Sequence, residues 1–532
     1  MDPLPSIKSI AIIGAGPAGL SAAYEFLHTS RDGEYSGSAL PDLPAFEKIV
    51  IFEQQDDIGG IWNTKIDHPD SGLPPKQFLA SGTYHDADQI HPQNWEQLDS
   101  DHQKIIEHAD ESHPIITTHI DDTLQWSRSA VYDGLFTNVP KPFLRFSMFE
   151  NDDLQHNDGF ESEINPLANY KKLSATLHKF SDTYDLRKLV RFLTQVESIS
   201  KKDSQWELVL RRYNQTSNKD EWYSEKFDAV LVASGHYSVP FVPFVPGLGE
   251  YELAYPDSII HNKAWRSPEP YRGKNVLFVG GSLSSIDILQ YVAPVANKTY
   301  ISRRNYGTPE KTPAVFPWLD RAAETKGIIN KPGISKFDTE NKKIEFADGS
   351  IVDDIDKVIF STGYHWHYPF LPKDNNGRQL VSISAGDSKS GSSTSRLEGL
   401  YQHIFAIDDP TLAFSGVKIS SMKWLAIETS NVAIAGVWSG ATKLPSKEIQ
   451  RKWEEDLVGK TGNNLGFHYS PWNLLKQDFV DQVFPLATKG RKDPLAQWDN
   501  DVINEEFDKT SEVLEQTFHK FKNGEFTYQD SI

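Results

Sequence analysis

The chain contains no cysteine among its 532 residues. This absence excludes structural disulfides, metal sites built from thiolates and any catalysis by a redox-active cysteine pair. Long apolar runs are also missing, since no segment approaches the roughly 18 apolar residues that cross a bilayer. The N-terminus has no basic stretch followed by an apolar run and a small-residue cleavage site. We therefore expect a soluble, cytoplasmic chain without a membrane span.

Positive charge is scarce: 54 lysine and arginine residues face 74 acidic ones, which gives a formal net charge of −20 at pH 7. A surface of that sign repels nucleic acid and anionic membranes, so we expect neither as a partner. The histidines between Lys65 and Arg128 have irregular spacings, with no HExxH motif and no i, i+4 pair. We expect an acidic surface insertion over residues 65–130 and no metal site. The histidines in this stretch include His85, His91, His102, His108, His113 and His119.

A glycine turn lies between a predicted strand and a predicted helix near the N-terminus. The apolar run 9–13 predicts a buried strand, and residues 20–27 predict a helix. In the turn, Gly14 permits the sharp bend, Gly16 lets a diphosphate approach the backbone, and Gly19 lets the helix pack against the strand. The turn therefore predicts a dinucleotide site.

The acidic residue that such a site needs follows the next predicted strand. Residues 48–52 form that strand, and Glu53 after it is placed to accept hydrogen bonds from a ribose. Because the usual spacing to this acid is about 20 residues, we expect a surface loop over residues 31–45.

A second unit of the same kind follows, with a strand over 274–279, a glycine turn from Gly280 to Ser285, a helix over 284–293 and a strand over 299–302. It ends in Arg303 and Arg304, where the first unit has its acid. An arginine fork accommodates a 2′-phosphate and so favours NADP over NAD. The alternative is a pair of solvated surface arginines.

Two matched apolar strands, 227–235 and 356–364, bracket the second unit. The fold class we predict is α/β, with two Rossmann-like dinucleotide-binding domains and the NADP domain inserted into the FAD domain. The first part of the FAD domain spans residues 1–238, and the NADP domain spans 239–360. The second part of the FAD domain and a C-terminal helical extension span 361–532.

Several further motifs occur in a specific order along the chain. They are Phe52-Glu53 with Gly59-Gly60-Ile61-Trp62, Tyr132-Asp133-Gly134-Leu135-Phe136-Thr137-Asn138-Val139-Pro140-Lys141, Gly235-His236-Tyr237-Ser238-Val239-Pro240, Phe360-Ser361-Thr362-Gly363-Tyr364 and Leu444-Pro445-Ser446. With these motifs the chain resembles the flavin-containing monooxygenases, class B flavoproteins that hold FAD and NADPH, and looks closest to their fungal members.

The chain departs from the family pattern at two places. The fingerprint before the second turn keeps His261, Trp265 and Arg266 but has Tyr255 and Asp257 where the family has phenylalanine and glycine. Tryptophan after this histidine is typical of the related Baeyer–Villiger enzymes, whereas arginine at the next position is typical of the monooxygenases. The second glycine turn has Ser282 and Ser285 in place of glycines, which predicts an altered affinity for NADPH.

The resemblance implies that NADPH reduces FAD, that oxygen adds to give a C(4a)-hydroperoxyflavin, and that a soft nucleophile takes one oxygen atom. It implies a catalytic role for Asn138, whose uncharged amide orients the cofactors. An alternative reading of Asn138 is a turn residue before Val139-Pro140. The turns and the resemblance together assign FAD contacts to Gly14, Gly16, Pro17, Ala18, Gly19, Glu53, Gly60, Ile61, Trp62, Thr137, Asn138, Val139 and Val196, and NADP contacts to Gly280, Ser282, Ser284, Ser285, Arg303 and Arg304.

The function this predicts is oxygenation of sulfur or nitrogen in a small-molecule substrate, with molecular oxygen as the second substrate. The alternatives are a Baeyer–Villiger monooxygenase acting on ketones, an NADPH oxidase that releases hydrogen peroxide, and a flavin-binding protein without turnover. The sequence leaves the substrate and the oligomeric state open, a homodimer included.

Overall fold

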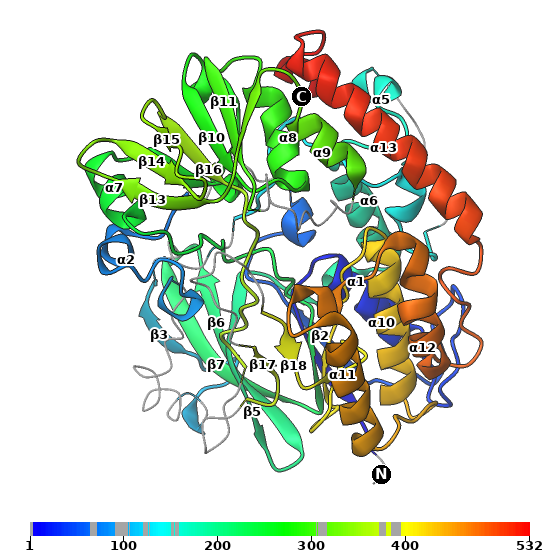
Figure 1. Ribbon diagram of the computed structural model, residues 1–532. Helices are drawn as coiled ribbons and strands as arrows, with labels where there is room; N and C mark the ends of the chain where they lie inside the picture. The colour runs from blue at the N-terminus through cyan, green and yellow to red at the C-terminus, as the bar shows by residue number, and fades with distance from the viewer. Residues whose placement is uncertain are drawn as a thin grey trace.

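The computed structural model describes residues 4–63, 72–90, 105, 107–120, 126, 128–149, 154, 159–304, 306, 316–371, 379–384 and 395–532. His91 and His102 of the predicted insertion lie outside the described residues. Two sheets, one mainly and one entirely parallel, have helices packed on them and occupy different ends of the molecule (Figure 1).

The first sheet has the strand order β19-β20-β21-β8-β1-β2-β4. Strands β21, β8, β1, β2 and β4 are parallel, while β19, β20 and β21 are joined by antiparallel pairs. The central strands are continuous apolar runs because both faces of a parallel sheet are covered. The bounds are β1 Ser9–Ile13, β2 Lys48–Phe52, β4 Val190–Arg191, β8 Ala229–Val232, β19 Leu400–Tyr401, β20 Phe405–Ala406 and β21 Leu412–Phe414.

The second sheet has the order β12-β11-β10-β16-β9, with every pair parallel. Its strands are β9 Ile259–His261, β10 Asn275–Val279, β11 Lys298–Ser302, β12 Ile328–Lys331 and β16 Lys357–Phe360. All of them fall between β8 and β19 of the first sheet along the chain. The predicted α/β fold, with one Rossmann-type unit inserted into another, is therefore confirmed. The boundaries after residues 238 and 360 stay predictions.

Smaller sheets complete the fold. Strand β3, in the predicted acidic insertion, pairs with β7 at the edge of an antiparallel sheet ordered β3-β7-β6-β5, so part of the insertion belongs to regular structure. The remaining strands are β3 Ile115–Thr118, β5 Thr194–Lys202, β6 Gln205–Asn214, β7 Lys219–Phe227, β13 Ile334–Asp338, β14 Lys343–Phe346, β15 Ile351–Val352, β17 Ser382–Ile383 and β18 Leu397–Glu398. Residues 385–394, within the Ser/Gly-rich stretch 381–396 that we expect to form a loop, lie outside the described residues.

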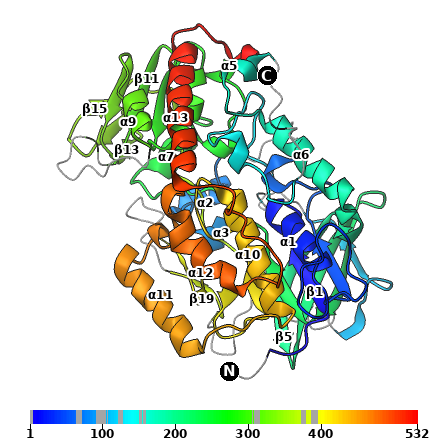
Figure 2. The ribbon, with the colours of Figure 1, turned by 90° about the vertical axis from the view of Figure 1, so that its right-hand side faces the viewer.

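Two long helices, α10 and α13, pack against the first and the second unit, respectively. Helix α10 is buried along nearly its whole length against α1, whereas α13 lies across the second unit (Figure 2). Leu514, Phe518 and Phe521 of α13 enter the core around Trp265 and Tyr291. The helices are α1 Pro17–Leu27, α2 Lys76–Ser81, α3 Ala87–Ile90, α5 Phe160–Glu163, α6 Tyr170–Thr183, α7 Leu248–Ala254, α8 Leu283–Val292, α9 Pro317–Ala323, α10 Lys423–Trp438, α11 Lys447–Thr461, α12 Asp481–Val483, α13 Asn500–Lys522 and α14 Tyr528–Ser531.

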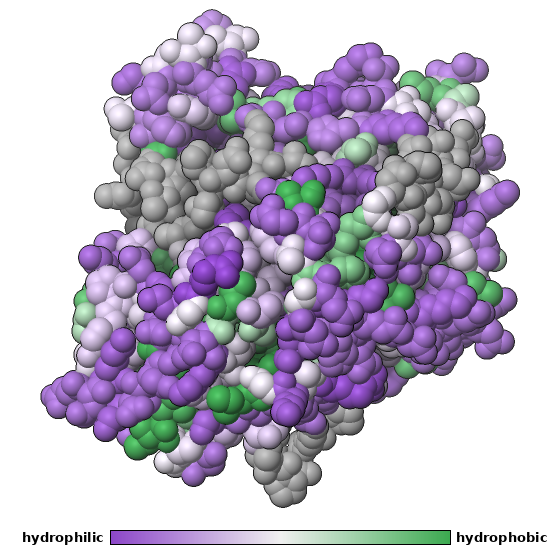
Figure 3. Space-filling view, turned by 90° about the horizontal axis from the view of Figure 1, so that it is seen from above, coloured by the Kyte–Doolittle hydropathy of each residue, from purple (hydrophilic) through white to green (hydrophobic). Residues whose placement is uncertain are grey.

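The surface agrees with the charged composition. Seen from above, it is mostly hydrophilic, and apolar residues occur in small scattered groups (Figure 3). Within the described ranges, none of the helices combines the length and the apolar character that a membrane crossing requires.

Candidate functional site

The first glycine turn has the geometry of a diphosphate site. Gly14 has a φ of +104°, and its N–H donates to the carbonyl oxygen of Phe52 at 2.8 Å. A Cβ atom on Gly14 would lie 2.8 Å from the carbonyl oxygen of Ala233, and a Cβ on Gly19 would lie 1.9 Å from that of Gly14. Both positions therefore need glycine.

The helix after this turn begins without a side-chain cap. Gly16 is the N-cap residue of α1, Pro17 is its first residue, and Ala18 follows. Because no side chain accepts from the first backbone N–H groups, these groups are available to bind an anion, which the helix dipole also favours. This end of α1 fits a diphosphate.

Glu53 lies at the adjoining strand end and is 5% exposed. Its Oε2 accepts from the N–H of Ala15 at 2.7 Å, and its Oε1 accepts from the N–H of Gln55 at 2.9 Å. Burial raises the pKa of this carboxyl, and the backbone N–H groups oppose that rise. Each oxygen keeps a lone pair, so the carboxylate can still accept from ribose hydroxyls.

The other residues predicted to contact FAD surround this turn at differing depths. A Cβ atom on Gly60 would lie 3.1 Å from the Cα of Gly16, so the two backbones face each other. Ile61 is exposed, Trp62 packs partly buried against the first core, and Val196 is buried in β5. The structure thus brings Gly60 to the turn, while the roles of the other three stay predictions.

The second glycine turn repeats the first. Gly280 has a φ of +112°, its N–H donates to the carbonyl oxygen of Ser302 at 3.0 Å, and a Cβ atom there would lie 2.5 Å from the carbonyl oxygen of Ser361. Ser282 is the N-cap residue of α8, but its side chain accepts no hydrogen bond from the helix. Ser282 and Ser284 are exposed, so α8 also offers free N–H groups to an anion.

Ser285 differs from the glycine expected at its position. It is fully buried, and its Oγ has no hydrogen-bond partner among the described residues. A buried unpaired hydroxyl costs about 1–3 kcal/mol. The substitution therefore affects the packing of α8 rather than the surface that would face a cofactor.

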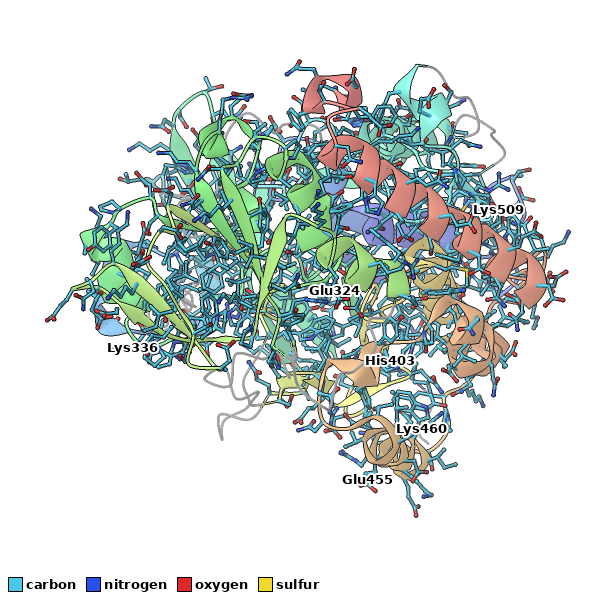
Figure 4. The ribbon with its side chains drawn as sticks, turned by 45° about the horizontal axis from the view of Figure 1, so that its top comes forward. Glu324, Lys336, His403, Glu455, Lys460 and Lys509 are labelled. Carbon is cyan, nitrogen blue, oxygen red and sulfur yellow. The ribbon has the colours of Figure 1, made fainter. Side chains whose placement is uncertain are left out.

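The two arginines after β11 are placed differently from each other. The guanidinium of Arg303 donates to Asp320 at 2.6 Å and to Asn330 at 2.8 Å, and it pairs with Glu324 at 3.0 Å. Glu324 lies at the end of α9 (Figure 4). Arg304 is exposed. Arg304 is the more exposed of the two, and a phosphate contact stays a prediction for both.

Tyrosine hydroxyls tie a loop of the first unit, residues 132–138, to α8 of the second unit and to the C-terminal helix α14, and we call it the clasped loop. The hydroxyl of Tyr132 donates to Asp287 of α8. Tyr291 of α8 donates to the carbonyl oxygen of Gly134 at 3.0 Å, and Tyr528 of α14 donates to that of Asp133 at 2.5 Å. The loop that carries Asn138 is therefore anchored to the helix that follows the second turn.

Asp287, which holds the clasped loop, is partly buried, and desolvation raises its pKa to about 7. At the far end of the loop, the N–H of Thr137 donates to the carbonyl oxygen of Ala168 at 2.9 Å, and its Oγ1 donates to that of Val139 at 3.0 Å. Asn138 between them is exposed. The hydrogen bonds of Thr137 therefore hold the backbone of the loop, while the side-chain amide of Asn138 remains accessible.

The fingerprint residues before the second turn join the two units. Lys263 donates to the carbonyl oxygens of Trp126 at 2.7 Å and Ser238 at 2.6 Å, and Arg266 donates to that of Ser129 at 2.8 Å. Burial lowers the pKa of His261 to about 3, so this histidine is neutral. Lys263 and Arg266 therefore connect the two units through hydrogen bonds.

Sequence reasoning missed the clasp and a buried group of basic side chains at the start of α10, which includes Lys418 and Lys423. The one local signal was two lysines interrupting an otherwise apolar stretch. In the part of the chain that the structure describes, no group of three or more histidine, aspartate or glutamate side chains is arranged as a metal site.

Comparison with known proteins agrees with this geometry. A family model described as flavin-binding monooxygenase-like matches residues 118–308 and 323–487. The flavin-containing monooxygenase iboF of Amanita muscaria is 24% identical over 84% of this chain and 81% of its own length. The thiol-specific monooxygenase of Saccharomyces cerevisiae is 27% identical over 76% of this chain and 71% of its own.

A solved structure supports the fold. S-allyl-L-cysteine S-oxygenase from Allium sativum aligns with a TM-score of 0.62 at 22% identity, covering 96% of this chain and 100% of that one. The family match spans most of the chain, including the clasped loop, the fingerprint and the second glycine turn. The chain is therefore an enzyme that belongs to the flavin-binding monooxygenase-like family.

Proposed function

We propose that this enzyme uses NADPH and oxygen to transfer one oxygen atom to a soft nucleophile, sulfur or nitrogen, of a small molecule. FAD would bind at the first glycine turn and NADPH at the second. The observation that carries the proposal is the hydrogen bond between Tyr132 and Asp287. It joins the loop of Asn138 to the helix of the second turn, so both cofactor sites meet at one loop.

The residues of this chain would bind and orient, while bound FAD supplies the redox chemistry by accepting electrons from NADPH and activating oxygen. Glu53 would hold a ribose, and the first N–H groups of α1 and α8 would hold the two diphosphates. Asn138 would offer an amide that donates and accepts without a change of charge. A neutral amide suits this site, because it does not protonate the bound oxygen and so does not promote its release.

The names of two compared proteins favour sulfur as the acceptor. One is called a thiol-specific monooxygenase and the other an S-allyl-L-cysteine S-oxygenase. Both names describe oxygenation at a soft, divalent sulfur. We therefore expect thioethers or thiols to be better substrates than ketones.

The test is a substrate panel of thioethers, thiols, amines and cyclic ketones, given with NADPH to the purified holoenzyme. We expect substrate-dependent NADPH consumption and products heavier by one oxygen atom from sulfur or nitrogen compounds. Hydrogen peroxide as the sole product, or esters from ketones, would contradict the proposal. Isotopically labelled oxygen gas identifies the source of the transferred atom.

Asn138→Ala is expected to retain FAD but to divert turnover to hydrogen peroxide. Losing one hydrogen bond of about 1.4 kcal/mol at the reacting centre should slow oxygen transfer roughly tenfold. The measurement is the ratio of peroxide to oxygenated product. Asn341→Ala, which alters an exposed side chain beside β14, serves as the control. An unchanged ratio in Asn138→Ala would count against the role given to Asn138.

Arg304→Ala is expected to raise the KM for NADPH roughly tenfold or more, because a charge-assisted hydrogen bond contributes about 1.5–3 kcal/mol. The KM for NADH should stay nearly constant, since NADH lacks the 2′-phosphate. Arg303→Ala should also weaken NADPH binding, but it leaves Asp320 and Glu324 without their cation. Equal changes for both coenzymes in Arg304→Ala would refute its contact with the phosphate.

A further inference from the structure

Two lysines, Lys418 buried and Lys423 partly buried, lie where the chain passes from β21 to α10. Lys418 is 5% exposed, and Lys423 is the first residue of α10. The ammonium of Lys423 donates to the carbonyl oxygens of Gly416 at 2.5 Å and Lys418 at 2.8 Å. Neither lysine forms an ion pair with any carboxylate in the described ranges. The ammonium of Lys423 is therefore held by backbone carbonyl oxygens and not by a carboxylate.

This arrangement is costly in the absence of a ligand. Burial lowers the pKa of Lys423 to about 7, and the nearby charge of Lys418 lowers it further in the same direction. Burial lowers the pKa of Lys418 to about 8, although Asp478 opposes the shift. Buried charges are normally paired, because an isolated ammonium in a protein interior is strongly unfavourable. An anion bound beside these lysines would remove the cost.

Besides Asp478, whose charge acts on Lys418, two histidines lie in this region. The amide N–H of Leu397 donates to Nε2 of His468 at 3.0 Å, so the proton of His468 is on Nδ1, which lies 3.1 Å from Nδ1 of His403. Burial and the lysine charges hold the pKa values of His403 and His468 well below their usual range. In Figure 4, His403 lies further inside than Glu455 and Lys460 of α11. The pair of histidines therefore adds no negative charge.

Two unpaired polar atoms mark the same region. Ser415, between β21 and Gly416, is 3% exposed, and its Oγ has no partner among the described residues. His236 follows β8 and packs its ring on Trp366 at a centroid distance of 4.3 Å, while its buried Nε2 is also unpaired there. Burial, followed by the charge of Lys423, lowers the pKa of His236 well below its usual range. Buried polar atoms without partners are rare, and a bound ligand is one explanation for them.

Strand order places this region beyond the flavin end of the first dinucleotide site. Along the sheet, Glu53 follows β2, the glycine turn follows β1, His236 follows β8, and the lysines follow β21. A ligand with its ribose at Glu53 and its diphosphate at α1 continues toward β8 and β21. A Cβ atom on Gly416 would lie 3.9 Å from the Cβ of Ala18, so the start of α10 adjoins the diphosphate end of α1.

We propose that Lys423, together with Lys418, forms a cationic site that compensates the negative charge of reduced FAD. This inference rests on the proposed function. Hydride transfer from NADPH adds two electrons and one proton to neutral FAD, leaving an anionic reduced flavin and NADP⁺. Positive charge near the flavin ring stabilises that anion relative to oxidised FAD, and a preorganised charge in a dry site acts strongly. The two lysines thus make bound FAD easier to reduce.

The experiment measures the reduction potential of bound FAD and its affinity for sulfite, which adds to oxidised flavin and leaves an anionic adduct. Lys423→Met should lower the reduction potential of bound FAD by at least about 30 mV, which for a two-electron couple is a tenfold change in the ratio of reduced to oxidised FAD. It should weaken sulfite binding by a similar factor. Lys423→Arg should restore both values. Lys443→Met, which changes an exposed lysine beyond the opposite end of α10, should change neither.

Lys423→Met with bound FAD but unchanged potential and sulfite affinity would overturn the inference. If that variant does not retain FAD, Lys418→Gln and Lys418→Arg provide the same comparison. The reduction potential of bound FAD should fall in Lys418→Gln and not in Lys418→Arg, and equal potentials in the two variants would overturn the inference. A wild-type protein that binds no FAD, or whose FAD is not reduced by NADPH, would instead contradict the proposed function.

Discussion

Replacing Arg491 with methionine is expected to lower the free energy of unfolding by about 3–5 kcal/mol, the usual cost of breaking a buried ion pair. Arg491 contacts Glu25 of α1 at 2.9 Å and Glu428 of α10 at 2.5 Å, and both glutamates are 0% exposed. Without the guanidinium, two carboxylates would face each other in the core. The measurement is unfolding of the wild-type and variant holoenzymes by denaturant and by heat.

Arg451→Met is the matched control. Arg451 pairs with Asp408 on the surface, where both side chains are more than one-third exposed, and such pairs contribute about 0–1 kcal/mol. Adding Glu25→Gln and Glu428→Gln to Arg491→Met should recover part of the lost stability, because the repulsion disappears. Equal losses in Arg491→Met and Arg451→Met would contradict the role of this network in holding α10 against α1.

Gly14→Ala is expected to abolish FAD binding. The backbone at Gly14 has a φ of +104°, and the new Cβ atom would lie 2.8 Å from the carbonyl oxygen of Ala233. Left-handed backbone costs a residue with a side chain about 1–2 kcal/mol, and here the Cβ contact with a carbonyl oxygen adds to that cost. The turn must therefore shift and carry the start of α1 with it. The ratio of FAD to protein after gel filtration measures the effect.

Gly37→Ala separates the two causes. Gly37 also has a positive φ, +75°, but a Cβ atom there would meet nothing within 4 Å. This variant should keep its FAD and show only a small loss of stability. Full FAD occupancy in Gly14→Ala would mean that the first turn does not hold the cofactor.

Residue type and spacing predicted the parts of the site that depend on local backbone geometry. Gly14 and Gly280 both have the positive φ and the close carbonyl contact that only glycine permits, so their place after a buried strand was informative. Glu53 was predictable for the same reason, because a strand end fixes where its side chain lies.

Contacts between distant segments could not be read from the sequence. Tyr132 and Asp287 are 155 residues apart in the sequence, and Asp133 and Tyr528 are 395 apart. No local sequence pattern therefore predicts the contacts that hold the clasped loop. The partners of Arg303 show the same limit, since α9 and β12 supply them, and its phosphate contact stays a prediction. Lys418 and Lys423 become notable only once their surroundings in the structure are known.

The most direct test of two cofactor sites in one chain is the anaerobic reduction of bound FAD by NADPH in Gly280→Ala. A Cβ atom at Gly280 would lie 2.5 Å from the carbonyl oxygen of Ser361 and disturb the second turn alone. We predict full FAD occupancy, normal reduction by dithionite, and reduction by NADPH slowed at least about tenfold, a loss of about 1.4 kcal/mol or more. Reduction by NADPH at the wild-type rate, or loss of FAD together with NADPH binding, would contradict the account.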